Sequence, residues 1–283
     1  MMSNNIILNR LFTPSVFLSL INHQDFAIFN TCIKRYLSDI DLTSNNHKII
    51  TKLYHYLRKQ YRNEYYYKNT LLNKILLGSH SLNTTVALSE IPVNKSKADF
   101  VLINGKATVY EIKTELDTFD RLDSQINDYY KMFNRVCVVT SESNYNKLND
   151  KLYNSNVGIS VLTNRNTISP RKQPIEDNSH LEHSSMFRTL RKKEFENILN
   201  LHFGELPKTT QVNYYKECLR WFNQINIEIL YPYLLAELKK RNIGEKEEFL
   251  NVPYELKSLV YFSKFKKDDY HKLEDFLSET WRG

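Results

Sequence analysis

The chain has 283 residues, of which 41% are hydrophobic and 25% charged, a composition typical of a globular protein with one large or two smaller domains. Its three cysteines, Cys32, Cys137 and Cys218, lie far apart, which argues against a disulfide framework or a zinc ribbon and favours a cytoplasmic protein. No run of about 20 apolar residues and no signal-peptide pattern is present, so neither a membrane span nor secretion is expected.

The net charge of +7 is concentrated near the N-terminus. Residues 34–74 contain nine Lys and Arg against three acids, together with a group of tyrosines between Tyr54 and Tyr67. Basic side chains neutralise phosphates and aromatic rings stack on bases, so this stretch is a candidate nucleic-acid surface. A solvated helix face with half-buried tyrosines explains the same pattern, and charge alone does not separate the two interpretations.

The spacing of apolar residues predicts the following order of elements. Helices are expected over residues 5–36 and, after a polar break at 39–47, over 48–77 as one helix or two joined near Gln60. Strands follow at 84–93, 98–103 and 107–114, then a helix at 120–133, a strand at 135–141, a short helix at 145–152 and a strand at 156–163. This order predicts an α/β fold with a mixed sheet flanked by helices.

Four segments are expected along the chain. They are a helical N-terminal extension (1–47), an α/β core (48–163), a polar, proline-bearing linker (164–185) and a helical C-terminal domain (186–283). The long helical pattern within the last segment is predicted to kink or break at Pro232. We expect this helical region to shape the substrate, form a homodimer or dock a protein partner.

Three charged residues interrupt the apolar strands of the core. Glu111 and Lys113 share one face of their strand, because side chains alternate along a strand. Whether Asp99 joins them depends on the turn: a two-residue Asn-Gly hairpin would put Asp99 on the opposite face. A three-residue loop with Gly105 in a left-handed conformation shifts the register by one and brings Asp99 to the face of Glu111, and we predict this loop or an equivalent bulge.

An acid on one strand followed by Glu-x-Lys on the next resembles the active site of the PD-(D/E)XK nuclease superfamily. Asp99 matches the first acid, although Ala98 stands where the motif has proline, and Glu111 and Lys113 match without departure. Gln125 and Tyr129 in the following helix resemble the Q-x-x-x-Y signature of the RecB-like branch. The resemblance covers roughly residues 60–163 and implies a restriction-endonuclease-like sheet.

The resemblance also implies the chemistry of the site. Asp99, Glu111 and the backbone carbonyl of Ile112 would bind Mg²⁺ or Mn²⁺, hard ions that prefer oxygen ligands. Lys113 would orient or activate a water and stabilise the charge that grows on a phosphate. Glu64, on the preceding helix, matches a position where the superfamily often keeps another acid, and it is a candidate metal ligand and catalytic residue.

Four residues are candidates for binding substrate: Gln125, Tyr129, Arg121 and Lys68. The first three form a polar stripe at helical spacing that can contact phosphate, although an ordinary solvent face has the same pattern. Lys68 follows Glu64 by one turn, so an ion pair between the two is the alternative.

These features predict a metal-dependent nuclease. The expected substrate is DNA in preference to RNA, because most functions known on this fold are DNA cleavage. Restriction, repair and mobile-element or defence settings are all consistent with the resemblance. The alternatives are a non-catalytic nucleic-acid-binding or scaffolding protein on the same fold, and, for the charged residues, a plain buried ion-pair network.

Overall fold

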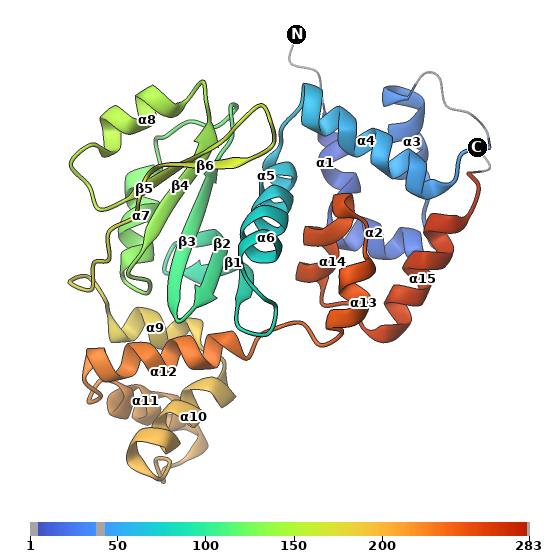
Figure 1. Ribbon diagram of the computed structural model, residues 1–283. Coiled ribbons are helices and arrows are strands. Elements are labelled where there is room, and N and C mark those ends of the chain that lie inside the picture. The colour runs from blue at the N-terminus through green and yellow to red at the C-terminus, as the bar shows by residue number, and fades with distance from the viewer. Residues whose placement is uncertain (1–4, 38–42, 282–283) are drawn as a thin grey trace. The chain divides into compact units, whose positions relative to one another are not determined.

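A computed structural model describes residues 5–37 and 43–281, and it divides the chain into two compact units. One unit combines the residues up to Gly78 with those from Ile243, and the other spans Ser79–Asn242 (Figure 1). This division differs from the expected segments, because the C-terminal helices are shared between the two units. The predicted polar break at 39–47 lies partly outside the described residues.

The first unit is built from helices taken from both ends of the chain. They are α1 (Ile6–Leu11), α2 (Pro14–Ile21), α3 (Ala27–Tyr36), α4 (Asn46–Gln60), α5 (Glu64–Leu71), a π-helical stretch (Leu72–Leu76), α6 (Leu77–Ser79), α13 (Lys246–Asn251), a short 3₁₀ turn (Tyr254–Leu256), α14 (Lys257–Ser263) and α15 (Lys267–Ser278). The predicted junction near Gln60 is confirmed. A new helix starts there because the side chain of Asn63 accepts a hydrogen bond from the backbone N–H of Tyr66 and caps α5.

The second unit contains a six-stranded mixed sheet with the strands in chain order. The strands are β1 (Val86–Val93), β2 (Ser96–Asn104), β3 (Lys106–Lys113), β4 (Val136–Ser141), β5 (Gly158–Leu162) and β6 (Ile168–Lys172). β3, β4 and β5 are parallel neighbours, joined through α7 (Leu122–Tyr130) and α8 (Tyr145–Leu152), and the other pairs are antiparallel. The predicted α/β class and mixed sheet are therefore confirmed.

Two predicted details differ from the structure. The segment 164–185, expected as a linker, contributes strand β6, which pairs with β5. Its polar composition fits an edge strand, where one side faces solvent. The helical pattern breaks before Asn226, and Pro232 lies inside α12 without ending it. Asn226 caps α12 by accepting from the N–H of Glu228, so the break lies there, and the break expected at Pro232 is wrong.

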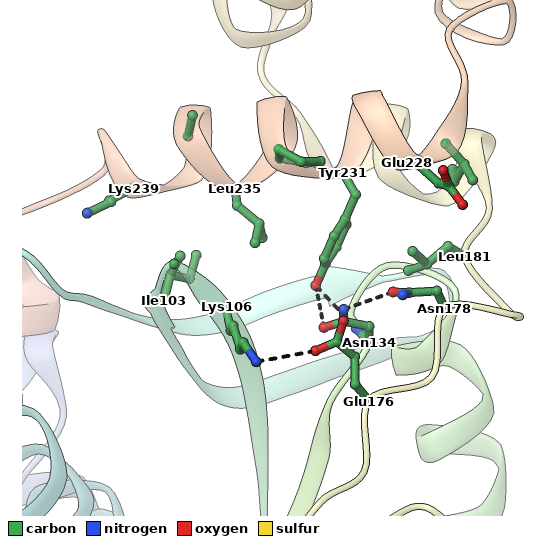
Figure 2. A pocket seen from close by; sticks show the side chains of 14 residues that line it. Ile103, Lys106, Asn134, Glu176, Asn178, Leu181, Glu228, Tyr231, Leu235 and Lys239 are labelled. Atoms are coloured by element: carbon green, nitrogen blue, oxygen red, sulfur yellow. Dashed lines mark hydrogen bonds and ion pairs between the residues drawn. The ribbon is translucent and has the colours of Figure 1, made fainter.

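Four further helices belong to the second unit: α9 (His183–Thr189), α10 (Lys192–Phe203), α11 (Gln211–Phe222) and α12 (Ile227–Lys239). Their apolar side chains join those of the sheet and α7 in one hydrophobic cluster. The Tyr231 hydroxyl donates to Asn134 Oδ1 at 2.9 Å, and Figure 2 shows this contact beside a pocket of about 530 Å³ between α12 and the β2–β3 hairpin. These helices therefore share a core with the sheet instead of forming a domain apart from it.

None of the helices in the described ranges has the length and apolar character needed to cross a membrane.

Candidate functional site

The β2–β3 hairpin has the predicted register. Ile103 pairs with Ala107 and Asn104 with Lys106, and Gly105 has a φ of 67°. The odd-length loop is therefore confirmed. Glycine suits the position because a left-handed backbone is strained for residues with a Cβ.

This register carries Asp99 toward Glu111. The last pair of the ladder is Phe100 with Tyr110, and one step further along the same register Asp99 stands opposite Glu111. Beyond that pair, a side chain of β2 takes the place of a backbone carbonyl as the acceptor. Asp99 Oδ2 accepts from the N–H of Ile112 at 2.8 Å. Because the N–H and C=O of one strand residue point to the same neighbour, the carbonyl of Ile112 is also directed toward β2.

Glu111 is a buried acid with a full set of polar partners. Its side chain is 2% exposed. Gln125 Nε2 donates to Oε1 at 2.5 Å, the Tyr129 hydroxyl donates to Oε2 at 2.6 Å, and Lys113 Nζ lies 3.0 Å from Oε1. Burying a carboxylate without such partners would strongly destabilise the folded state. The hydrogen bonds and the ion pair with these three groups offset that cost.

Lys113 is held from two sides. Its Nζ donates to Gln125 Oε1 at 2.8 Å while it pairs with Glu111, and its own carbonyl accepts from Thr140 Oγ1 at 2.8 Å. The Gln125 amide thus bridges the acid and the base, with its nitrogen toward Glu111 and its oxygen toward Lys113. This arrangement fixes the positions of both charges on β3.

The Tyr129 hydroxyl is fully buried and lies between two acceptors. Besides Glu111 Oε2, the carbonyl oxygen of Lys97 is 2.7 Å away. Burial, followed by the negative charge of Glu111, raises the pKa of Tyr129. The hydroxyl therefore keeps its proton at neutral pH and stays a donor.

The predicted polar stripe on α7 is thus divided by the structure. Gln125 and Tyr129 turn inward to the charged residues of β3, alongside the apolar residues of the same helix. Arg121, the helix N-cap, is exposed. Both residues contact charged residues of β3 in the structure, Gln125 both Glu111 and Lys113 and Tyr129 only Glu111; direct contact of either residue with a phosphate stays a prediction.

Glu64 and Lys68 lie on α5, which belongs to the other unit. Their side chains form the ion pair considered as the alternative, with Lys68 Nζ 2.6 Å from Glu64 Oε1. The Glu64 side chain is 56% exposed. Of the candidate residues, the second unit therefore brings together Asp99, Glu111, Lys113, Gln125 and Tyr129.

Asp117 supports the site from the turn that follows β3. Its carboxylate accepts from the backbone N–H and the hydroxyl of Thr114, at 2.7 and 2.6 Å. These bonds shape the turn that follows Lys113. The signal in the sequence is the Thr-x-x-Asp spacing directly after the strand, since short polar side chains commonly close such turns.

Comparisons with known proteins identify one family. A profile of the family described as bacteriophage P4 protein cII matches residues 57–260. Protein cII of Enterobacteria phage P4 is 23% identical over 180 residues, which is 60% of this chain and 66% of that protein, just under two thirds of its length. No solved structure shows significant similarity to the chain. Because the matched segment covers well over half of the chain, the protein belongs to the bacteriophage P4 protein cII family.

Proposed function

We propose that this protein is a metal-dependent nuclease of the PD-(D/E)XK superfamily that hydrolyses phosphodiester bonds, with DNA favoured over RNA. The observation that supports it best is the register of the β2–β3 hairpin, which brings Asp99 opposite Glu111 beside Lys113. The six-stranded mixed sheet, with strands antiparallel before β3 and parallel after it, is compatible with a restriction-endonuclease-like fold.

The donor set at this place suits Mg²⁺ or Mn²⁺. Asp99, Glu111 and the carbonyl of Ile112 offer hard oxygen atoms from two adjacent strands, and such ions prefer oxygen ligands and retain several waters. When bound, a divalent ion polarises the phosphate and lowers the pKa of a coordinated water. Glu64 remains a candidate ligand from the resemblance alone, since it lies in the other unit.

The chain's own residues have distinct roles in this proposal. Lys113 contributes a positive charge beside Glu111, positioned to stabilise the negative charge that develops on a phosphate. Gln125 holds the acid and the base at a fixed separation, and Tyr129 orients the Glu111 carboxylate. Because these groups are ordered before substrate arrives, little reorganisation is needed during the reaction.

A non-catalytic nucleic-acid-binding or scaffolding protein is the second candidate. One observation favours it: the protein itself already supplies partners for the charges of Asp99, Glu111 and Lys113. In that case the cluster is a buried ion-pair network that shapes the fold, and substitutions in it would alter stability without affecting any reaction.

We propose a mobile-element setting for this activity. The named relative is a phage protein, which favours a mobile-element role among the settings that the resemblance implies. A cytoplasmic location, a homodimer and a protein partner bound through the C-terminal helices belong to the same proposal.

Cleavage assays test the nuclease directly. Supercoiled plasmid, linear duplex and single-stranded DNA would be incubated with Mg²⁺ or Mn²⁺, with EDTA as the metal-free control. Wild type is compared with Asp99→Asn, Lys113→Met and Lys106→Ala, the last being a lysine at the other end of β3. We expect metal-dependent cutting that both site variants lose and Lys106→Ala retains. Absence of cutting by folded wild type that still binds DNA would support the non-catalytic candidate.

A further inference from the structure

A stripe of basic residues runs along α4 in the first unit. Lys48, Lys52, His55 and Lys59 follow one another at steps of four, three and four, which places them on one face of a helix. Lys48, His55 and Lys59 are exposed and Lys52 is half-buried. At 1.5 Å per residue the stripe is about 16 Å long, enough to contact more than one phosphate of a strand.

The basic residues of the stripe, and Lys34 and Arg58 on the same two helices, have no acidic partner in the described chain. Neither α3 nor α4 contains an Asp or Glu. Lys34, Lys48, Lys52, Arg58 and Lys59 form no ion pair with any acid in the described ranges, whereas Lys68, Lys113 and Lys151 are all paired. Like charges on adjacent turns repel one another, so the proximity of Lys48 and Lys52 does not stabilise the helix.

An aromatic groove lies beside the stripe. Its volume is about 500 Å³, and it is lined by residues of α3, α4 and Leu37 between them. The half-buried rings of Tyr36 and Tyr56 have centroids 4.8 Å apart at an angle of 48°, and the Arg35 guanidinium lies 5.6 Å from the Tyr36 ring centre. The Tyr36 hydroxyl donates to Asn5 Oδ1 at 3.0 Å, which holds its ring in place.

We propose that this groove binds single-stranded nucleic acid. The backbone phosphates would contact Lys52, His55 and Lys59 on its rim, and an unstacked base would lie against Tyr36 and Tyr56. Base faces are accessible only in a single strand, so the aromatic groove favours a single strand over a duplex. The inference rests on the proposed nucleic-acid substrate but not on catalysis, because the groove lies outside the unit that holds Glu111 and Lys113.

Binding is measured by fluorescence anisotropy in EDTA, so that failure of the proposed cleavage does not affect the result. The probes are labelled dT15, rU15, a 15-base-pair duplex and a labelled poly-glutamate peptide. Tyr56→Leu removes the ring but keeps an apolar side chain, and Lys52→Ala with Lys59→Ala removes two charges. Lys193→Ala with Lys216→Ala is the matched control, since both are exposed lysines of the second unit.

We expect dT15 or rU15 to bind more tightly than the duplex, and the comparison of the two shows whether the groove prefers DNA or RNA. Tyr56→Leu should weaken that binding about tenfold, as expected for the loss of one base–aromatic stack. The double lysine variant should reduce the slope of log K against log salt by about 1.4, at about 0.7 per phosphate contact. The control variant should bind as wild type does.

Two results would overturn the proposal. One is equal affinity of Tyr56→Leu and wild type for single strands, together with an unchanged salt slope in the double lysine variant. The other is binding of poly-glutamate as tight as that of dT15, which would identify an acidic protein segment as the ligand. The lysine substitutions change exposed or half-buried side chains, so we expect these variants to fold. The salt slope of the double lysine variant therefore still tests the proposal if Tyr56→Leu does not fold.

Discussion

The hydroxyl of Tyr129 offers a sharp test of how the buried acid is stabilised. Tyr129→Phe removes one oxygen atom from a fully buried side chain and leaves its ring in place. It removes the donor to Glu111 Oε2 and leaves the nearby Lys97 carbonyl without this partner. A hydrogen bond to a charged group contributes about 1.5–3 kcal/mol, and an unsatisfied buried group costs a similar amount, so we expect a loss of about 2–3 kcal/mol in unfolding free energy.

The neighbouring residue on α7 supplies the control. The Tyr130 side chain is 7% exposed, and its buried hydroxyl has no hydrogen-bond partner among the described residues. Tyr130→Phe should therefore leave stability unchanged or raise it by up to about 1 kcal/mol. Urea unfolding followed by circular dichroism, in EDTA, would measure both variants. Equal stability of Tyr129→Phe and Tyr130→Phe would refute the reasoning, because it would mean that the contact with Glu111 contributes nothing.

Three further predictions follow from single contacts. Gln125→Leu should reduce metal-dependent cleavage at least tenfold, because Glu111 and Lys113 lose the amide that bridges them. A plasmid cleavage assay measures the effect, with circular dichroism to show that the variant is folded. Full activity of the folded variant would contradict the prediction. Gly105→Ala should lower the unfolding free energy by about 1 kcal/mol, and Gly105→Asn by less. A Cβ at Gly105 meets no atom within 4 Å, so only the left-handed backbone opposes the substitution. Equal stability of the variants and wild type in thermal melts would show that the turn is unstrained. Burial lowers the pKa of Lys257 to about 8, below its value in the unfolded chain. Above pH 8 the unfolded chain therefore binds more protons than the folded protein. The unfolding free energy should rise by about 2 kcal/mol between pH 7 and 9.5. Lys257→Met should abolish that rise in urea titrations, and an identical pH profile for both proteins would assign it to other groups.

The sequence by itself determined the elements around the charged residues. Alternation along β3 predicts that Glu111 and Lys113 share a face, and Asn-Gly at the turn limits the hairpin to a few registers. The apolar spacing predicts a mixed sheet with helices, and the structure contains it. These features follow from the sequence because side-chain period and turn chemistry are local properties.

Tertiary structure decided what each element packs against. The pattern of α7 places Gln125 and Tyr129 on a polar stripe, yet both turn inward, because Glu111 is a buried charge that needs donors. The C-terminal helices look alike in sequence, but α12 joins the sheet through Tyr231 and Asn134, whereas α15 packs with α2 and α4. Which amphipathic helix covers which apolar face depends on shape and volume between residues far apart in the chain, and no local pattern carries that information.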